Sequence, residues 1–135
     1  MAIQIEANQR EVPTEKAQLM GGLEAFFKIT DEWGLNRDQR RLLLGFPGTT
    51  LYTEWKSGKV KDGPISTDLL DRLSYILGIY KALKIMHSEE NRLLFLTNAT
   101  QIAPFNCKSP LEYMLSGHLV ALADVRRYLD FQRGM

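Results

Sequence analysis

The sequence predicts an all-α protein, and three observations lead to that prediction. Helix-capping residues precede several apolar runs, and glycines follow them. No segment alternates apolar and polar residues over enough positions to predict a strand. The clearest helical spacing lies in the middle of the chain, at Leu69, Leu73, Ile76, Leu77, Tyr80 and Leu83.

The N-terminal part is expected to be an arm followed by a first helix. Residues 1–13 are expected to form a flexible arm that ends at Pro13, and Thr14 is suited to cap a helix that ends at Gly34. The adjacent Gly21 and Gly22 weaken the prediction that this helix is unbroken. Its apolar positions follow helical spacing: Leu19, Leu23, Phe26, Phe27 and Trp33.

Two short helices joined by a tight turn are expected next. Asn36, with Gln39 three residues later, has the pattern of a capping box. Residues 45–48, Gly-Phe-Pro-Gly, have the composition of a turn, and a further helix is expected over residues 49–56. Two apolar residues four positions apart are expected to share one face of that helix: Leu51 and Trp55.

The C-terminal half is expected to contain four more helices, the first of which is the long one. Ser66 or Thr67 is suited to cap the long helix, and Ser88 to cap the next. After a loop, Ser109-Pro110-Leu111-Glu112 has Ser, Pro and Glu at the N-cap, N1 and N3 positions that favour them. The last helix is expected over residues 119–131.

Composition limits the classes to which the chain can belong. Its 135 residues, 44% hydrophobic and 24% charged, suit one compact domain or two small helical units that share a core. The single cysteine, Cys107, excludes an intrachain disulfide, and no apolar run approaches the length of a membrane span. Residues 1–10 lack the apolar region of a signal peptide. We therefore expect a cytoplasmic protein that does not enter a membrane.

The two short helices resemble a helix-turn-helix. Residues 36–61 contain six basic and two acidic residues, a local net charge of +4 against +1 for the chain. The second helix of such a pair can lie in the DNA major groove. The predicted DNA contacts are Arg40, Thr49, Thr50, Tyr52, Thr53, Lys56, Lys59 and Lys61.

A solvated helical hairpin without DNA binding is the alternative for this segment. DNA-binding pairs usually carry a small residue where the helices cross, and here Arg40 and Arg41 occupy those positions. The turn also contains Pro47-Gly48, which suits the motif poorly.

No set of residues predicts catalysis, a metal site or a cofactor. His87, His118 and Cys107 are too far apart in sequence for their spacing to place a base beside the thiol or to suggest metal ligation. The acidic pairs at residues 31–32 and 89–90 are adjacent on expected helices and do not face each other. We therefore expect a protein that is not an enzyme.

The C-terminal third resembles a known family. Its segments Leu94–Asn98, Phe105, Ser109–Gly117 and Val125–Gly134 together resemble the Xre/MbcA/ParS-like toxin-binding domain of antitoxins that partner RES-domain toxins. The resemblance covers roughly residues 88–135, and the preceding part resembles more loosely the Xre-type helical domain. Two departures stand out: Phe95 where the family often has Trp, and Asn106-Cys107-Lys108 where it often has a Gly pair.

The resemblance implies an arm (1–13), an Xre-like helix-turn-helix domain (14–87) and a small helical toxin-binding domain (88–135). It implies an antitoxin of a type II toxin-antitoxin system that occludes the active site of an NAD-degrading RES toxin. Such antitoxins usually form homodimers within the complex, and the resemblance also implies that the complex binds its own promoter. The alternative is a stand-alone helix-turn-helix regulator. The implied toxin contacts are Arg126, Arg127, Tyr128, Asp130, Arg133, Gly134 and Met135.

Overall fold

The computed structural model describes residues 15–134, which form helices and no strand, so the all-α prediction is confirmed. The predicted arm, the Thr14 cap and Met135 lie outside the described residues. Within residues 15–134, no helix combines the length and the apolarity that a membrane crossing needs. The helices are α2 (Glu15–Glu32), α3 (Arg37–Leu43), α4 (Thr49–Lys56), α5 (Thr67–Met86), α6 (Glu89–Thr97), α7 (Pro110–Met114) and α8 (Leu119–Gln132).

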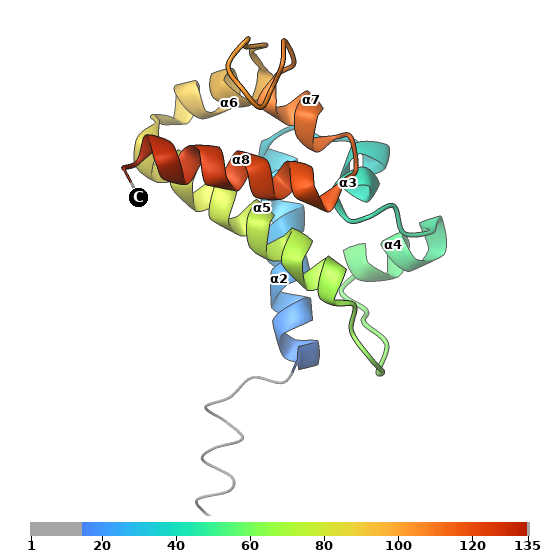
Figure 1. Cartoon of the computed structure of the whole chain (residues 1–135). Helices are drawn as coiled ribbons and strands as arrows, with labels where there is room; N and C mark the ends of the chain where they lie inside the picture. The colour runs from blue at the N-terminus through green and yellow to red at the C-terminus, as the bar shows by residue number, and fades with distance from the viewer. Residues whose placement is uncertain (1–14, 135) are drawn as a thin grey trace, which may run out of the picture.

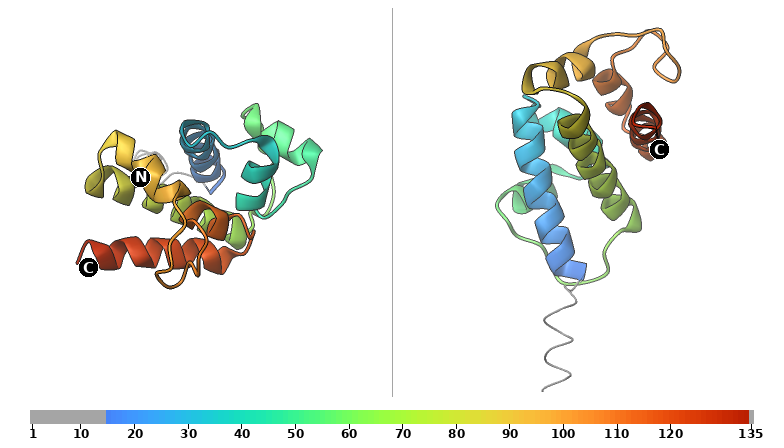
Figure 2. Two further views of the ribbon diagram at one scale, coloured as in Figure 1. Left: turned by 90° about the horizontal axis from the view of Figure 1, so that it is seen from above. Right: turned by 90° about the vertical axis from the view of Figure 1, so that its left-hand side faces the viewer.

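The long helix α5 lies at the centre of the fold. It packs against α2 on one side and against α8 on another, and these are the most extensive helix contacts in the described chain. Helices α5 and α8 run side by side in the same direction, with α6, a loop and α7 forming the connection between them (Figures 1 and 2). The pair α3 and α4 projects from the side of this bundle (Figure 1).

One apolar core serves both predicted domains. Phe26 of α2, Ile76 of α5 and Leu122 and Leu129 of α8 belong to the same cluster of buried side chains. The predicted boundary after residue 87 falls at the junction of α5 and α6, and the buried cluster continues across it.

Most of the predicted helix caps are present. Asn36 and Ser109 each form a capping box with the residue three positions later, and the Ser66 hydroxyl accepts from the Leu69 N–H at 3.2 Å. Ser88 precedes α6 but makes no side-chain capping hydrogen bond. Gly21 and Gly22 do not interrupt α2, because apolar contacts of that helix with α5 hold it together.

Candidate nucleic-acid interface and C-terminal partner surface

Two buried arginines fix α3 to the bundle. Arg40 donates from Nε to the Thr30 hydroxyl of α2 at 3.0 Å, and its side chain is only 9% exposed. Arg72 of α5 donates to the Leu43 carbonyl near the end of α3 at 3.3 Å. Arg40 is held in this buried network and is only 8% exposed, so little of it is left for the predicted DNA contact, which stays a prediction.

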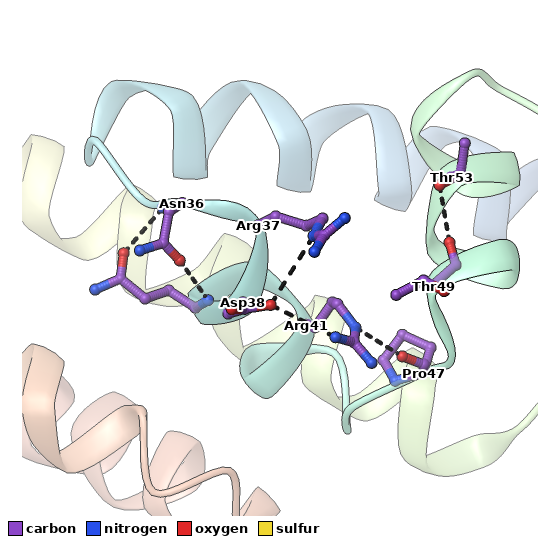
Figure 3. Close-up of polar contacts among 8 residues, drawn as sticks. Asn36, Arg37, Asp38, Arg41, Pro47, Thr49 and Thr53 are labelled. Atoms are coloured by element: carbon purple, nitrogen blue, oxygen red, sulfur yellow. Dashed lines mark hydrogen bonds and ion pairs between the residues drawn. The ribbon is translucent and has the colours of Figure 1, made fainter.

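The turn after α3 is held by Arg41. Gly45 and Phe46 have φ of +87° and +60°, which lets the chain reverse tightly. The Arg41 Nε donates to the Pro47 carbonyl at 2.9 Å, as Figure 3 shows, and its guanidinium carbon lies 4.2 Å from the centre of the Phe46 ring. The arginine at the helix crossing therefore stabilises the turn, so a small residue is not required there.

Helix α4 presents its polar side chains to solvent. Thr49, Thr50, Thr53 and Lys56 are exposed, and we call these four residues the α4 face. The Thr53 hydroxyl donates to the Thr49 carbonyl at 2.8 Å and so lies along the helix (Figure 3). This arrangement leaves the α4 face free to meet a ligand.

The buried side of α4 differs from the one predicted. Tyr52 is 2% exposed and packs edge-on against Phe27 with ring centres 5.6 Å apart. Leu51 is 38% exposed, and Trp55 is half-buried. The ring of Tyr52 is therefore not available to bases, because the core occupies the space around it, and the predicted DNA contact of this residue stays a prediction.

Further basic side chains surround the α4 face. Lys59 and Lys61 are exposed in the loop after α4, and the Lys61 ammonium lies 3.9 Å from the Glu54 carboxylate. Arg37, which the sequence analysis did not select, begins α3 with a side chain that is 64% exposed. The available signal was its place among the six basic residues of residues 36–61.

An aromatic cluster organises the C-terminal part. The Tyr128 ring lies 6.2 Å from Phe95, in stacked orientation, and 5.1 Å from Phe105, in edge orientation. Phe105 is fully buried, and the Tyr128 hydroxyl accepts from the Gln132 side-chain amide at 3.2 Å. The ring and the hydroxyl of Tyr128 therefore both contact other residues of the chain, and the residue is half-buried.

Arg126 joins α8 to α5. It donates from Nη1 to the Gly78 carbonyl at 2.7 Å and forms an ion pair with Asp130 at 3.4 Å. Both side chains are 30% exposed. Two of the predicted toxin contacts are therefore also internal contacts that hold α8 in place.

Arg127 and Phe131 form the outward side of α8. They lie four residues apart, and the Arg127 side chain and Phe131 are each 76% exposed. Ala103 and Pro104 of the preceding loop line the same shallow hollow as these two residues. We call Arg127, Phe131 and Pro104 the α8 surface. Phe131 was missed, and its spacing away from the buried Val125 and Leu129 was the signal that could have found it.

The predicted tail begins where α8 ends. Arg133 is the half-buried C-cap of α8, and its N–H donates to the Leu129 carbonyl at 3.1 Å. Gly134 is exposed with φ of +82°. The predicted toxin contacts Asp130, Arg133 and Gly134 stay predictions, as does Met135 beyond the described residues.

The loop before α7 has an unusual backbone. Asn106 and Cys107 have φ of +51° and +71°, a region that favours glycine. The Cys107 N–H donates to the Thr100 carbonyl at 2.8 Å, which closes the loop. Asn106 and Cys107, which stand where the family often has a Gly pair, therefore have backbone conformations that favour glycine.

The residues weighed for catalysis lie apart from one another. Cys107 is exposed in the loop, His87 stacks on Phe95 at 5.7 Å, and His118 is the N-cap of α8. Among residues 15–134, no group of three or more His, Cys, Asp or Glu side chains has the arrangement of a metal site.

Comparison with known proteins identifies the front half. Residues 16–78 match the family described as antitoxin Xre-like helix-turn-helix domain. The chain is 38% identical to the uncharacterized protein y4oB of Sinorhizobium fredii over 122 residues, which cover 90% of this chain and 91% of the relative. No solved structure matches the chain. The chain therefore belongs to one family with this Sinorhizobium fredii protein, and it carries an Xre-like helix-turn-helix domain of the antitoxin type.

Proposed function

We propose that the protein is the antitoxin of a type II toxin-antitoxin system and that it acts in the cytoplasm. The observation that carries the proposal is the antitoxin-type helix-turn-helix domain of residues 16–78, with its α4 face exposed. In this proposal, α3 and α4 bind promoter DNA, and the segment from α6 to α8 binds the toxin.

The DNA-binding part of the proposal is supported by charge and by rigidity. Arg37, Lys56, Lys59 and Lys61 are exposed around the α4 face, so they are available to phosphates. The contacts of Arg40, Arg41 and Arg72 hold α3 and the turn in one geometry. The threonines of the α4 face are then the side chains that reach base edges, with Thr methyl and hydroxyl groups suited to that task.

The toxin-binding part of the proposal is supported by the resemblance of residues 88–135 and by the α8 surface. Arginine and aromatic residues are both enriched at protein interfaces. We propose a RES-type, NAD-degrading toxin as the partner. Arg127 and Phe131 make the first contacts, and Arg133, Gly134 and Met135 enter the active-site opening. The complex contains a homodimer of this chain.

Co-expression with the product of the neighbouring gene tests the proposal. Co-purification together with preserved cellular NAD is the expected result, and a neighbour that neither binds this chain nor depletes NAD contradicts it. Removing Arg133–Met135 tests the occlusion step, because this cut leaves α8 whole. The truncated protein is expected to bind the toxin but to lose neutralisation. Full neutralisation by the truncated protein contradicts occlusion by the tail.

A stand-alone transcriptional regulator is the second candidate, and the local charge of residues 36–61 favours it. The two candidates differ in one measurement. A regulator binds its promoter with the same affinity whether or not the neighbouring protein is present. An antitoxin binds the promoter as part of a complex, so the neighbouring protein changes both the affinity and the size of the DNA-bound species.

A further inference from the structure

A hollow between the start of α3 and the last turn of α4 brings two cations together. Its volume is about 340 Å³, and none of its lining residues is acidic. Four of them come from one side of α4 and its C-cap, and the fifth is the first residue of α3. The lining residues are Arg37, Tyr52, Thr53, Lys56 and Ser57.

The two cations are available to a ligand. The Arg37 Nε forms a long ion pair with the Asp38 carboxylate at 3.9 Å, beyond hydrogen-bond distance, and the Arg37 side chain is 64% exposed. Lys56 is exposed, and no carboxylate in the described part of the chain pairs with it. The hydroxyls of Thr53 and Ser57 already donate to carbonyls of α4, each at 2.8 Å. The strong donors that remain for an incoming group are therefore the guanidinium and the ammonium.

Tyr52 supplies a second and independent observation. It is 2% exposed and forms part of the wall of the hollow. Its hydroxyl is buried and has no hydrogen-bond partner within residues 15–134. Buried hydroxyls are nearly always paired, so the unpaired hydroxyl of a residue that lines the hollow indicates that its missing partner is an acceptor bound there.

We propose that this hollow binds one phosphate group through Arg37, Lys56 and Tyr52. The planar guanidinium can donate to two oxygens at once, the ammonium adds a point charge, and the phenol gives one further donor. A phosphodiester of the DNA backbone and free inorganic phosphate share this chemistry. The DNA source rests on the proposed function: in helix-turn-helix complexes the first helix of the pair crosses the backbone, and Arg37 begins α3.

DNA binding by the full chain tests the first source. The affinity for a labelled duplex from upstream of the protein's own gene is measured by fluorescence anisotropy over a series of salt concentrations. Arg37→Gln and Lys56→Gln are each expected to weaken binding about five- to twentyfold. The double variant is expected to lower the salt slope by about one, the value for a single shared phosphate, and not by about two. Lys81→Gln, an exposed charge on α5, is the matched control and leaves both quantities unchanged.

The Tyr52→Phe variant separates the hydroxyl from the charges. It keeps the ring that packs on Phe27 and removes the unpaired hydroxyl, so the melting temperature without phosphate stays the same or rises. Its DNA affinity falls, but its salt slope stays that of the wild type because no charge is lost. A melting temperature several degrees lower, with unchanged DNA affinity, overturns the role of the hydroxyl.

Free phosphate tests the second source without DNA. Sodium phosphate is expected to raise the melting temperature of the wild type above its value in sodium chloride of equal ionic strength. Tyr52→Phe and the Arg37→Gln, Lys56→Gln double variant are expected to lose most of that rise, and Lys81→Gln to keep it.

The outcomes distinguish this site from the proposed function. DNA binding in which the hollow variants behave like Lys81→Gln overturns the site and leaves the proposed function intact. A phosphate effect that depends on Arg37, Lys56 and Tyr52, without binding to the duplex, supports the site with free phosphate as its ligand and contradicts promoter binding. If neither measurement depends on these three residues, the proposal is overturned.

Discussion

Gly78→Ala offers a sharp test of how α8 is attached to α5. A Cβ at residue 78 would lie 2.9 Å from the Arg126 Nε, 3.0 Å from its Cζ and 3.1 Å from its Cδ. The end of the Arg126 side chain would therefore have to shift, and we expect its 2.7 Å hydrogen bond to the Gly78 carbonyl to be lost. The same substitution at Gly21, in the middle of α2, meets no atom within 4 Å. Gly21→Ala is therefore the matched control.

The expected magnitudes follow from these contacts. Replacing a glycine by alanine inside a helix raises the free energy of unfolding by about 0.5–1 kcal/mol, which is the whole effect at Gly21. At Gly78 the lost bond to a charged donor costs about 1.5–2 kcal/mol, the lower part of the usual range because Arg126 is 30% exposed. Gly78→Ala is therefore expected to lower the free energy of unfolding by about 0.5–1.5 kcal/mol.

Thermal and urea unfolding followed by circular dichroism measure this difference. The two variants are expected to differ in melting temperature by about 5–10 °C, at about 3–5 °C per kcal/mol for a chain of this size. In an Arg126→Ala background, Gly78→Ala is expected to become stabilising, because the crowded side chain is gone. If Gly78→Ala stabilises the wild type as much as Gly21→Ala does, the proposed attachment through Arg126 is refuted.

Three further predictions address other parts of the molecule. Arg127→Ala and Phe131→Ala, on the α8 surface, are expected to change the free energy of unfolding by less than about 0.5 kcal/mol. Both are expected to weaken toxin binding at least about tenfold, measured by calorimetry. Unchanged affinity excludes this surface as the toxin-binding site. Cys107→Gly is expected to raise the free energy of unfolding by about 1 kcal/mol in urea titrations, because φ is +71° there; a loss of stability contradicts the strain argument. The hydrogen bond from Tyr113 to the Asp124 carboxylate, helped by burial, raises the pKa of the phenol. The stabilising effect of this hydrogen bond is full below about pH 10 and is lost as the pH rises through the raised pKa. In urea titrations at alkaline pH, the free energy of unfolding of the wild type is therefore expected to fall toward that of Tyr113→Phe. A difference between the two proteins that stays constant with pH contradicts this prediction.

The helices and their caps were predictable because their signals are local. The capping boxes at Asn36 and Ser109 depend on residues three positions apart, and both are present. The long stripe of α5 contains enough turns to define its buried side, and Leu69, Leu73 and Ile76 are indeed buried.

The orientation of the short helices was not predictable from the same signals. Helix α4 has only two turns, and its apolar residues Leu51, Tyr52 and Trp55 allow more than one buried side. The structure buries Tyr52, because Phe27 of α2 lies against it. The choice depends on a residue 25 positions away in the sequence, which no local pattern contains.

Arginine roles were the least predictable part of the candidate sites. Arg37, Arg40, Arg41, Arg126 and Arg127 look alike as surface charges in the sequence. In the structure, Arg40 donates to a buried threonine and Arg126 to a carbonyl of another helix, whereas Arg127 is 76% exposed and donates to Asp124 of its own helix. Their partners lie up to 48 positions away, so only the three-dimensional contacts separate internal arginines from those free to bind a partner.

The shared core sets limits on how such proteins diversify. The family match ends at residue 78, within α5, and the buried Ile79, Ala82 and Leu83 follow in the same helix. If two relatives exchanged their C-terminal segments, the side chains of one buried core would come from two different proteins and would not fit each other. Partner choice is expected to change through outward positions such as Arg127 and Phe131, one substitution at a time, while the inward face of α8 is inherited together with α5, against which it packs.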